Sequence, residues 1–221
     1  MEKEKVVLIL SGGLDSTTLL YDLIDRGYDV RAVSFNYSQR HVRELKMARK
    51  TCKSLKIPHT VLSLKVLNQI APSCLTRKDW DVPEGHYEDE SMKQTVVPNR
   101  NMVMLSLATS YAIGIGAKRL FYGAHSGDHA LYPDCRKDFI DKMKEVIKIC
   151  DWSPVELEAP YWNMDKGDII MRGLKLGVNY KNTLTCYKGG KKSCGKCGSC
   201  TERLEAFKKA NSDDPIEYNY E

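Results

Sequence analysis

The sequence predicts an α/β fold built on a doubly wound, five-stranded parallel sheet of the Rossmann-like type, followed by a cysteine-rich C-terminal segment. Three observations support this prediction. Short apolar runs alternate with longer amphipathic stretches, which is the pattern of strand–helix–strand units with right-handed crossovers. The first apolar run ends in a turn rich in glycine and hydroxyl groups, as expected at the ligand-binding end of a strand. Four of the eight cysteines lie close together near the end of the 221-residue chain.

The length and composition indicate one globular domain. The 221 residues are enough for a sizeable core. We expect a single domain, 1–221, with the sheet and its helices in 1–177 and the cysteine-rich segment in 178–221. Hydrophobic residues make up 42% and charged residues 29%, as in ordinary soluble proteins. No apolar run approaches about 18 residues, and residues 1–5 lead directly into a strand, so we expect a cytoplasmic protein without a membrane span or signal peptide.

The charge and the cysteine count narrow the function classes. The net charge of +5 favours an anionic ligand such as a nucleotide and is too weak to predict binding of nucleic acid. Eight cysteines in a chain without an export signal indicate free thiols or metal ligands and argue against a disulfide framework.

The individual elements follow from the apolar pattern. Residues 6–10 (VVLIL) form a run without polar alternation, which predicts a strand buried on both faces. Leucines and isoleucine at helical spacing then predict a helix up to Arg26, and Gly27 ends it. Further strands are expected at 29–35, 59–64, 119–124 and 155–159, and further helices at 39–55, 101–117, 134–149 and 166–176.

Residues 71–97 lose this periodicity. They carry Pro72, Pro83 and Gly85 among charged residues, which is typical of a long loop. Loops of this length in compact domains are usually functional or disordered. We therefore expect a lid over the binding site, with a disordered loop as the alternative.

The turn at residues 11–17 (SGGLDST) is the centre of the predicted site. Its two glycines allow the backbone to approach a ligand closely, and the hydroxyls of Ser11, Ser16 and Thr17 can donate hydrogen bonds. The amides at the start of the following helix form an anion site. The turn therefore predicts a bound phosphate chain. The alternative is a glycine-rich turn with a serine helix cap.

Neither the GxxxxGK[ST] nor the GxGxxG phosphate motif fits this turn, which resembles instead the pyrophosphate loop SGGxD[ST] of the N-type ATP pyrophosphatases. That resemblance implies a fold of the adenine nucleotide alpha hydrolase type, cleavage of ATP between its α and β phosphates, and adenylation of an acyl or amide oxygen. Asp15 is then expected beside the phosphates as a partner of magnesium. The ATP-binding residues that the resemblance implies are Leu10, Ser11, Gly12, Gly13, Leu14, Asp15, Ser16, Thr17, Thr18, Leu19, Leu20, Phe35 and Gly123.

Three basic residues are catalytic candidates for offsetting the pyrophosphate charge together with magnesium. Arg40 follows the second predicted strand at the ligand-binding edge, where its planar guanidinium suits a phosphate. Arg100 begins a helix, so that helix amides and guanidinium can act on one anion. Lys166 begins the last helix of the sheet. The alternative for an arginine in this position is a solvated helix start.

The loop after the fourth strand, residues 123–136, places many donors and acceptors at the same edge. The substrate-binding candidates in it are Asp128, Tyr132, Asp134 and Arg136. Polar groups here can bind the hydrogen-bonding edge of a heterocycle while Tyr132 packs on its face, and Asp134 is the first choice for that edge. His125 and His129 have the spacing of a metal pair on a helix, but a loop bounded by glycine and proline does not favour it.

The C-terminal segment holds four thiolates at metal-binding spacing, Cys186, Cys194, Cys197 and Cys200. Four cysteine ligands close a tetrahedral zinc site without an open coordination position, which predicts one structural zinc ion per chain. An iron–sulfur cluster is the alternative, because cysteine thiolates hold either group.

Taken together, these stretches resemble the 7-cyano-7-deazaguanine synthase family of the queuosine and archaeosine pathway. Besides the pyrophosphate loop and the cysteines, the resemblance rests on residues 36–41 (NYSQRH), 67–69 (LNQ), 98–101 (PNRN), 132–136 (YPDCR) and 184–186 (LTC). Two departures occur. Asn99 replaces the family's glycine, and asparagine tolerates a left-handed turn better than most residues. At residues 166–168 (KGD), the family's Lys-x-Glu pattern keeps its lysine but has an aspartate, whose side chain is shorter, in place of the glutamate.

The resemblance implies that 7-carboxy-7-deazaguanine and ammonia are converted to the nitrile with two ATP, through an adenylated acid, an amide and an adenylated amide. The expected partners are therefore ATP, the carboxylate and ammonia, with no membrane and no nucleic acid, and the expected assembly is a homodimer. Two other classes stay open. A tRNA-modifying thiolase or lysidine synthetase is favoured by seven basic and two acidic residues in 186–209. A non-enzymatic nucleotide-binding or zinc-ribbon module would release no pyrophosphate from ATP.

Overall fold

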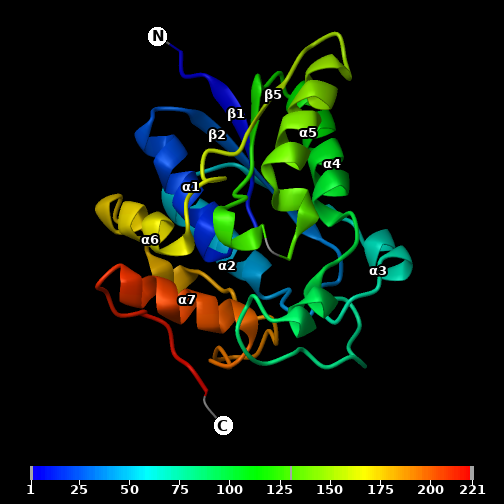
Figure 1. Cartoon of the computed structure of the whole chain (residues 1–221). Coiled ribbons are helices and arrows are strands. Elements are labelled where there is room, and N and C mark those ends of the chain that lie inside the picture. Colours follow the sequence, from blue (N-terminus) through cyan, green and yellow to red (C-terminus); the bar gives the residue numbers. More distant parts are fainter. Residues whose placement is uncertain (1, 130, 220–221) are drawn as a thin grey trace.

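The computed structural model describes residues 2–129 and 131–219, and their arrangement is shown in Figure 1. The described part of the chain contains a five-stranded sheet in the order β3-β2-β1-β4-β5, in which every neighbouring pair is parallel. The strands are β1 (Lys5–Ile9), β2 (Asp29–Asn36), β3 (His59–Ser63), β4 (Arg119–Phe121) and β5 (Glu156–Glu158).

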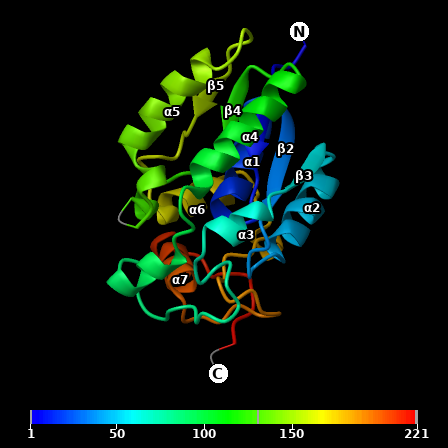
Figure 2. The same ribbon diagram turned by 90° about the vertical axis from the view of Figure 1, so that its right-hand side faces the viewer.

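Helices cover both faces of the sheet, as Figures 1 and 2 show. One face carries α1 (Leu14–Asp25), α2 (Glu44–Leu55) and α6 (Lys166–Lys175), and the other carries α4 (Arg100–Gly114) and α5 (Lys137–Ile149). Alternate residues of a strand point to opposite faces. Val6 and Leu8 accordingly join the apolar cluster under α1, and Val7 joins the cluster under α4. The unbroken apolar run of β1 is therefore explained, and the predicted doubly wound α/β fold is confirmed.

The strand order places β1 between β2 and β4, so the chain leaves β1 toward one edge of the sheet and later returns to its other side. This reversal is the topological switch point, and ligands of doubly wound sheets bind beyond the carboxyl ends of the strands there. The turn at residues 11–17 follows β1 at this position. The fold therefore places the predicted phosphate turn in the crevice where a ligand is expected.

Two predicted helices begin later than the apolar pattern suggested. The second starts at Glu44, because the side chain of Gln39 is used to close a turn: it accepts from the backbone N–H of Tyr37 at 3.0 Å and donates to the carbonyl of Phe35 at 3.1 Å. The helix predicted at 134–149 starts at Lys137, since the preceding residues Pro133–Cys135 form a separate 3-10 turn.

Residues 71–97, which were predicted to form a lid, pack several apolar side chains into the core. Cys74, Leu75 and Met92 are almost fully buried, and a 3-10 helix, η1, spans Glu90–Thr95. Glu84 forms an antiparallel bridge with Cys197 in the C-terminal segment. The short helix α3 (Val66–Ile70), which the sequence analysis missed, leads into this stretch.

The C-terminal segment contains a helix that was not predicted, α7 (Gly198–Lys209), which packs on α6. Its Arg203 is fully buried and donates to both carboxylate oxygens of Asp214, at 2.6 and 2.9 Å, and to Thr183 Oγ1 at 2.8 Å. Figures 1 and 2 show α7 at the end of the sheet opposite the N-terminus, where the parallel strands end. The described part of the segment, 178–219, thus lies over the switch point, and residues 220–221 fall outside the description.

Within residues 2–129 and 131–219, no helix is both long and apolar enough to span a bilayer.

Replacing Asp214 should test how firmly the C-terminal segment is joined to the sheet. Asp214→Asn leaves the buried guanidinium of Arg203 without its charge partner, so we expect the free energy of unfolding to fall by about 3 kcal/mol. The exposed neighbour offers the control, since Asp213→Asn should change it by less than about 0.5 kcal/mol. Urea denaturation measures both. An unfolding curve of Asp214→Asn that coincides with the wild-type curve contradicts the expectation.

Candidate active site

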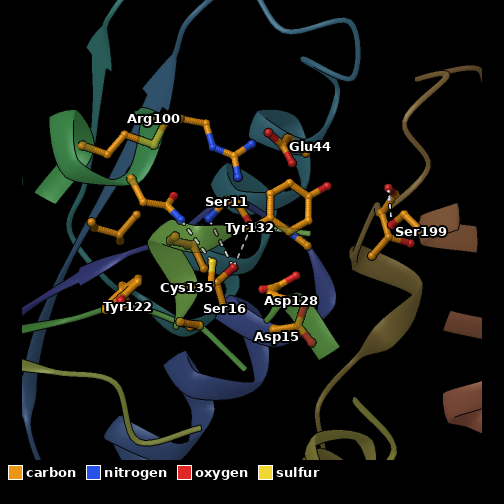
Figure 3. Close-up of a pocket in the computed structure, with 18 of the residues that line it drawn as sticks. Ser11, Asp15, Ser16, Glu44, Arg100, Tyr122, Asp128, Tyr132, Cys135 and Ser199 are labelled. Atoms are coloured by element: carbon orange, nitrogen blue, oxygen red, sulfur yellow. Dashed lines mark hydrogen bonds between the residues drawn. The ribbon is translucent and has the colours of Figure 1, made fainter. Parts of the chain in front are cut away.

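A cleft of about 230 Å³ lies at the carboxyl ends of β1, β2 and β4. Figure 3 shows its two ends, with Asp15 and Asp128 at one and Arg100 and Glu44 at the other. Its polar lining consists of Ser11, Asp15, Ser16, Tyr37, His41, Glu44, Arg100, Asn101, Tyr122, His125, Asp128, Tyr132, Cys135, Lys166, Thr185, Tyr187 and Ser199.

The turn between β1 and α1 is shaped by its own hydroxyls. Ser11 Oγ accepts from the N–H of Gly13 at 3.1 Å and lies 2.9 Å from Ser16 Oγ, which in turn accepts from the N–H of Ser11 at 3.2 Å. Gly12 has φ = 91°, and a Cβ there would lie 2.1 Å from the carbonyl oxygen of Glu44. Only glycine fits this contact. The turn is therefore held against the start of α2, with the first amides of α1 facing the cleft.

A buried cation lies beside this turn. Lys166 is 7% exposed, and its ammonium group pairs with Glu202 and lies 3.7 Å from Asp15 Oδ2. Burial by itself lowers the pKa of Lys166, but the carboxylates of Asp15 and Glu202 outweigh it and raise the pKa well above its ordinary value. Lys166 therefore carries its charge at every physiological pH.

The acidic groups next to Lys166 are available to a ligand. Asp15 Oδ1 is buried and has no hydrogen-bond partner among the described residues. His125 Nε2 lies 3.8 Å from Asp15 Oδ2 and 3.5 Å from Asp128 Oδ2. This end of the cleft thus combines helix amides, one fixed cation and two carboxylates, which suits a phosphate chain with its metal ion.

The other end of the cleft is aromatic. Arg100 Nη1 donates to Tyr37 Oη at 3.4 Å. Tyr132 Oη lies 2.8 Å from Thr95 Oγ1 and 2.9 Å from Tyr187 Oη. These hydroxyls support one another, so the rings form a fixed wall of the cleft.

The structure brings many of the predicted site residues together. The cleft lining includes Leu10, Ser11, Gly13, Asp15, Ser16, Phe35, Arg100, Gly123, Asp128, Tyr132 and Lys166. Gly123, at the end of β4, packs against the phosphate turn: a Cβ there would lie 3.4 Å from the backbone nitrogen of Ser16. The remaining predicted residues lie elsewhere.

Several predicted ATP-binding residues are not part of the cleft lining. They are Gly12, Leu14, Thr17, Thr18, Leu19 and Leu20. The three leucines are fully buried in the core under α1, because a helix presents only one of its sides to a ligand.

Arg40 lies outside the cleft. Its Nη2 donates to the carbonyl oxygens of Lys78 at 2.7 Å and Trp80 at 2.8 Å. The guanidinium therefore holds the loop after α3 in place and does not face the phosphate turn.

Two of the predicted substrate residues are also used elsewhere. Asp134 accepts from the backbone N–H of Asn101 at 3.0 Å and so caps the start of α4. Arg136 is exposed, and its Nε donates to the carbonyl of His129 at 2.7 Å. Neither side chain is part of the cleft lining, where Asp134 and Arg136 were predicted to bind the heterocycle.

Three residues of the site were not predicted from the sequence: Glu44, Glu202 and Tyr187. Glu44 and Glu202 are acidic residues within ordinary amphipathic stretches, and neither belongs to a recognisable motif. Tyr187 directly follows Cys186 of the cysteine cluster, and this position was the one sequence feature that could have indicated a place near the site. Tertiary packing, not local pattern, brings them to the site.

The four clustered cysteines can hold a metal ion. The Sγ atoms of Cys186, Cys194, Cys197 and Cys200 all lie within 4.8 Å of one another. Cys197 is the N-cap of α7 and Cys200 lies in its first turn. Ser199, which lines the cleft, and Glu202, which pairs with Lys166, lie in the same two turns.

Comparisons with known proteins agree with this geometry. The family model for the queuosine biosynthesis protein QueC matches residues 5–211. The chain is 64% identical over 214 residues to the 7-cyano-7-deazaguanine synthase of Methanoregula boonei, covering 97% of this chain and 99% of that protein. It is 59% identical over 217 residues to the enzyme of the same name from Caldicellulosiruptor saccharolyticus, and the match covers 98% of this chain and 96% of that protein. The solved structure of NMN synthetase from Francisella tularensis shares the fold, with a TM-score of 0.55 at 13% identity over 96% of this chain and 79% of that chain.

Removing Glu202 should destabilise the fold, because the buried ammonium group of Lys166 loses a carboxylate partner. In Glu202→Ala, Asp15 at 3.7 Å is the remaining carboxylate that pairs with the ammonium, so we expect the free energy of unfolding to fall by about 3 kcal/mol. Glu205 lies one turn further along α7, is 52% exposed and pairs with His86 at 3.5 Å. Glu205→Ala should therefore cost less than about 0.5 kcal/mol. Equal losses in the two variants, measured by urea denaturation, contradict the role of Glu202.

Proposed function

Since the chain belongs to the QueC family of queuosine biosynthesis proteins, we propose that it catalyses the ATP-dependent conversion of 7-carboxy-7-deazaguanine and ammonia to 7-cyano-7-deazaguanine. The observation that carries this proposal is the 64% identity to a 7-cyano-7-deazaguanine synthase over 97% of the chain. The phosphate turn beside a buried lysine supports the use of ATP. The family match also argues against a tRNA-modifying enzyme or a non-enzymatic module.

The proposed reaction consists of two activations at the same turn. The substrate's carboxylate oxygen attacks the α-phosphorus of ATP, pyrophosphate leaves, and ammonia then displaces AMP to give the amide. The amide oxygen attacks a second ATP in the same way, pyrophosphate leaves, and loss of AMP and of both protons of the amide nitrogen gives the nitrile. Carboxylate and amide oxygens are poor leaving groups until AMP is attached to them, and no protein nucleophile is required.

In this proposal the protein contributes position and charge. Ser11, Ser16 and the amides of α1 bind the phosphates, and Lys166 offsets the charge of the departing pyrophosphate. Arg100 lies at the other end of the cleft, beside Tyr37 and Glu44 (Figure 3). Magnesium binds oxygen ligands, and the unpartnered Oδ1 of Asp15 supports a place for it beside the phosphates. Bound magnesium would shield the phosphate charges from the attacking oxygen.

We further propose that the cysteine cluster holds one structural zinc ion, because four thiolates fit a closed tetrahedral site. A homodimer remains the expected assembly. The exposed Ile149 at the end of α5 and the exposed Trp152 just after it offer apolar surface for such a contact. The use of ATP supports a cytoplasmic location.

Product analysis tests the proposed reaction. We expect mass spectrometry to find the nitrile, AMP and pyrophosphate after incubation with the carboxylate, ATP, magnesium and ammonium. Ser11→Ala and Asp15→Asn should lower the rate of pyrophosphate release at least about tenfold, because they remove groups at the phosphates. Asp25, exposed at the end of the same helix, provides the control variant Asp25→Asn with an unchanged rate. Wild-type rates from both phosphate-turn variants contradict the proposal.

Metal analysis tests the zinc site. Purified protein should contain about one zinc per chain, and Cys197→Ser should lower the melting temperature by at least roughly 5 °C, since a closed structural site contributes folding energy. The exposed Cys150 offers the matched control, and Cys150→Ser should leave both zinc content and melting temperature unchanged. Iron in the preparation together with a visible absorption band would contradict the zinc assignment and show that the cysteines hold an iron–sulfur cluster.

A further inference from the structure

Three carboxylates line the cleft within the described part of the chain: Asp15, Asp128 and Glu44. Asp15 and Asp128 both face His125 Nε2, next to the phosphate turn. Glu44 lies apart from them at the start of α2, near Arg100 (Figure 3). The two ends of the cleft therefore offer carboxylates to different parts of a bound complex.

Glu44 has the properties of a ligand-binding carboxylate. It is 8% exposed, and its Oε1 accepts from Gln39 Nε2 at 3.0 Å and lies 3.5 Å from His41 Nε2. Both of these contacts are made by the same carboxylate oxygen, Oε1. Burial raises the pKa of Glu44 to about 7, against the opposing effects of Gln39 and Arg100. A ligand that donates hydrogen bonds to this carboxylate would offset its burial.

The surroundings of Glu44 suit a flat heterocycle. His41 is buried, and its Nδ1 has no hydrogen-bond partner among residues 2–129 and 131–219. The His41 ring centroid lies 6.5 Å from that of Tyr37 and 6.1 Å from that of Tyr187. Burial lowers the pKa of His41 to about 3, so its ring is neutral at physiological pH and does not repel a neutral base. Aromatic walls with one carboxylate at the end are a general solution for binding a base.

A guanine-type ring presents two adjacent donors, the ring N1–H and the exocyclic 2-amino group, and a carboxylate can accept both. Asp134 was the first candidate for this edge, but it caps α4 and does not line the cleft. We propose that Glu44 selects the substrate by accepting hydrogen bonds from the N1–H and 2-amino groups of the deazaguanine ring, with His41 as a neighbouring polar contact.

This assignment rests on the proposed function and has a consequence for the orientation of the substrate. The 7-carboxyl group is on the five-membered ring, at the opposite end of the bicycle from the 2-amino group. When the amino edge binds Glu44, the carboxyl group is free to face the phosphate turn. Glu44 would thus determine specificity at one end while adenylation takes place at the other.

Calorimetry with two ligands tests the assignment: 7-carboxy-7-deazaguanine and its analogue without the 2-amino group. Wild-type protein should prefer the amino-bearing ligand by about ten- to a hundredfold, because the analogue leaves an acceptor in a buried site unpaired. Glu44→Gln should lose most of this preference by weakening the binding of the amino-bearing ligand. Unchanged ATP affinity of the same variant shows that its cleft is folded.

Asp134→Asn is the matched control, because asparagine also caps helices, and this variant should keep the wild-type preference. Loss of preference in Asp134→Asn with full preference in Glu44→Gln overturns the assignment. If the wild-type protein converts the carboxylate but Glu44→Gln keeps the full preference for the amino-bearing ligand, the assignment of Glu44 is wrong. The proposed function is not affected by that result. A wild-type protein that does not convert the carboxylate overturns both.

Discussion

One buried charge, the ammonium group of Lys166, organises the active end of this molecule. A buried cation costs several kcal/mol unless carboxylates face it. The carboxylates come from segments far apart in the sequence, Asp15 after β1 and Glu202 in α7. Satisfying this charge therefore brings the phosphate turn, the start of α6 and the C-terminal segment to one point at the carboxyl end of the sheet. The cation that a phosphate chain needs and the position of α7 are consequences of the same electrostatic requirement.

The cysteine cluster is joined to the cleft through the first two turns of α7. Cys197 caps this helix, and Ser199, Cys200 and Glu202 follow within it. Ser199 Oγ donates to the carbonyl of Thr185 at 2.9 Å, next to the first cysteine of the cluster. The cleft-lining residues Thr185, Tyr187 and Ser199 are therefore chain neighbours of candidate metal ligands, and a metal ion bound by the thiolates would hold them in place. The described part of the segment shares an apolar cluster with the sheet, so it is built into the site.

Local features were predictable from the sequence, and features set by long-range packing were not. The five strands, the phosphate turn and the clustered cysteines depend on periodicity or on spacing within a few residues, and the structure contains all of them. The direction of a polar side chain in a loop depends on which partner is nearest in space. Arg40 and Asp134 occupy the predicted edge of the sheet but bind backbone groups there, of Trp80 and Asn101 respectively. Glu44 lines the cleft from the start of α2, which packs closely against the phosphate turn at Gly12.

The division of the cleft into a charged end and an aromatic end explains how one site can activate two different groups. The substrate enters the proposed reaction as a carboxylate and is activated again as an amide, so its reacting end changes charge between the two steps. The base edge does not change. A site that binds the substrate through Glu44 and the aromatic wall makes the same contacts with the carboxylate and with the amide. A site that bound the carboxylate through a salt bridge would bind the uncharged amide only weakly. Lys166 is then free to act on the phosphates, whose charge is the same in both steps, and a single phosphate turn can serve both.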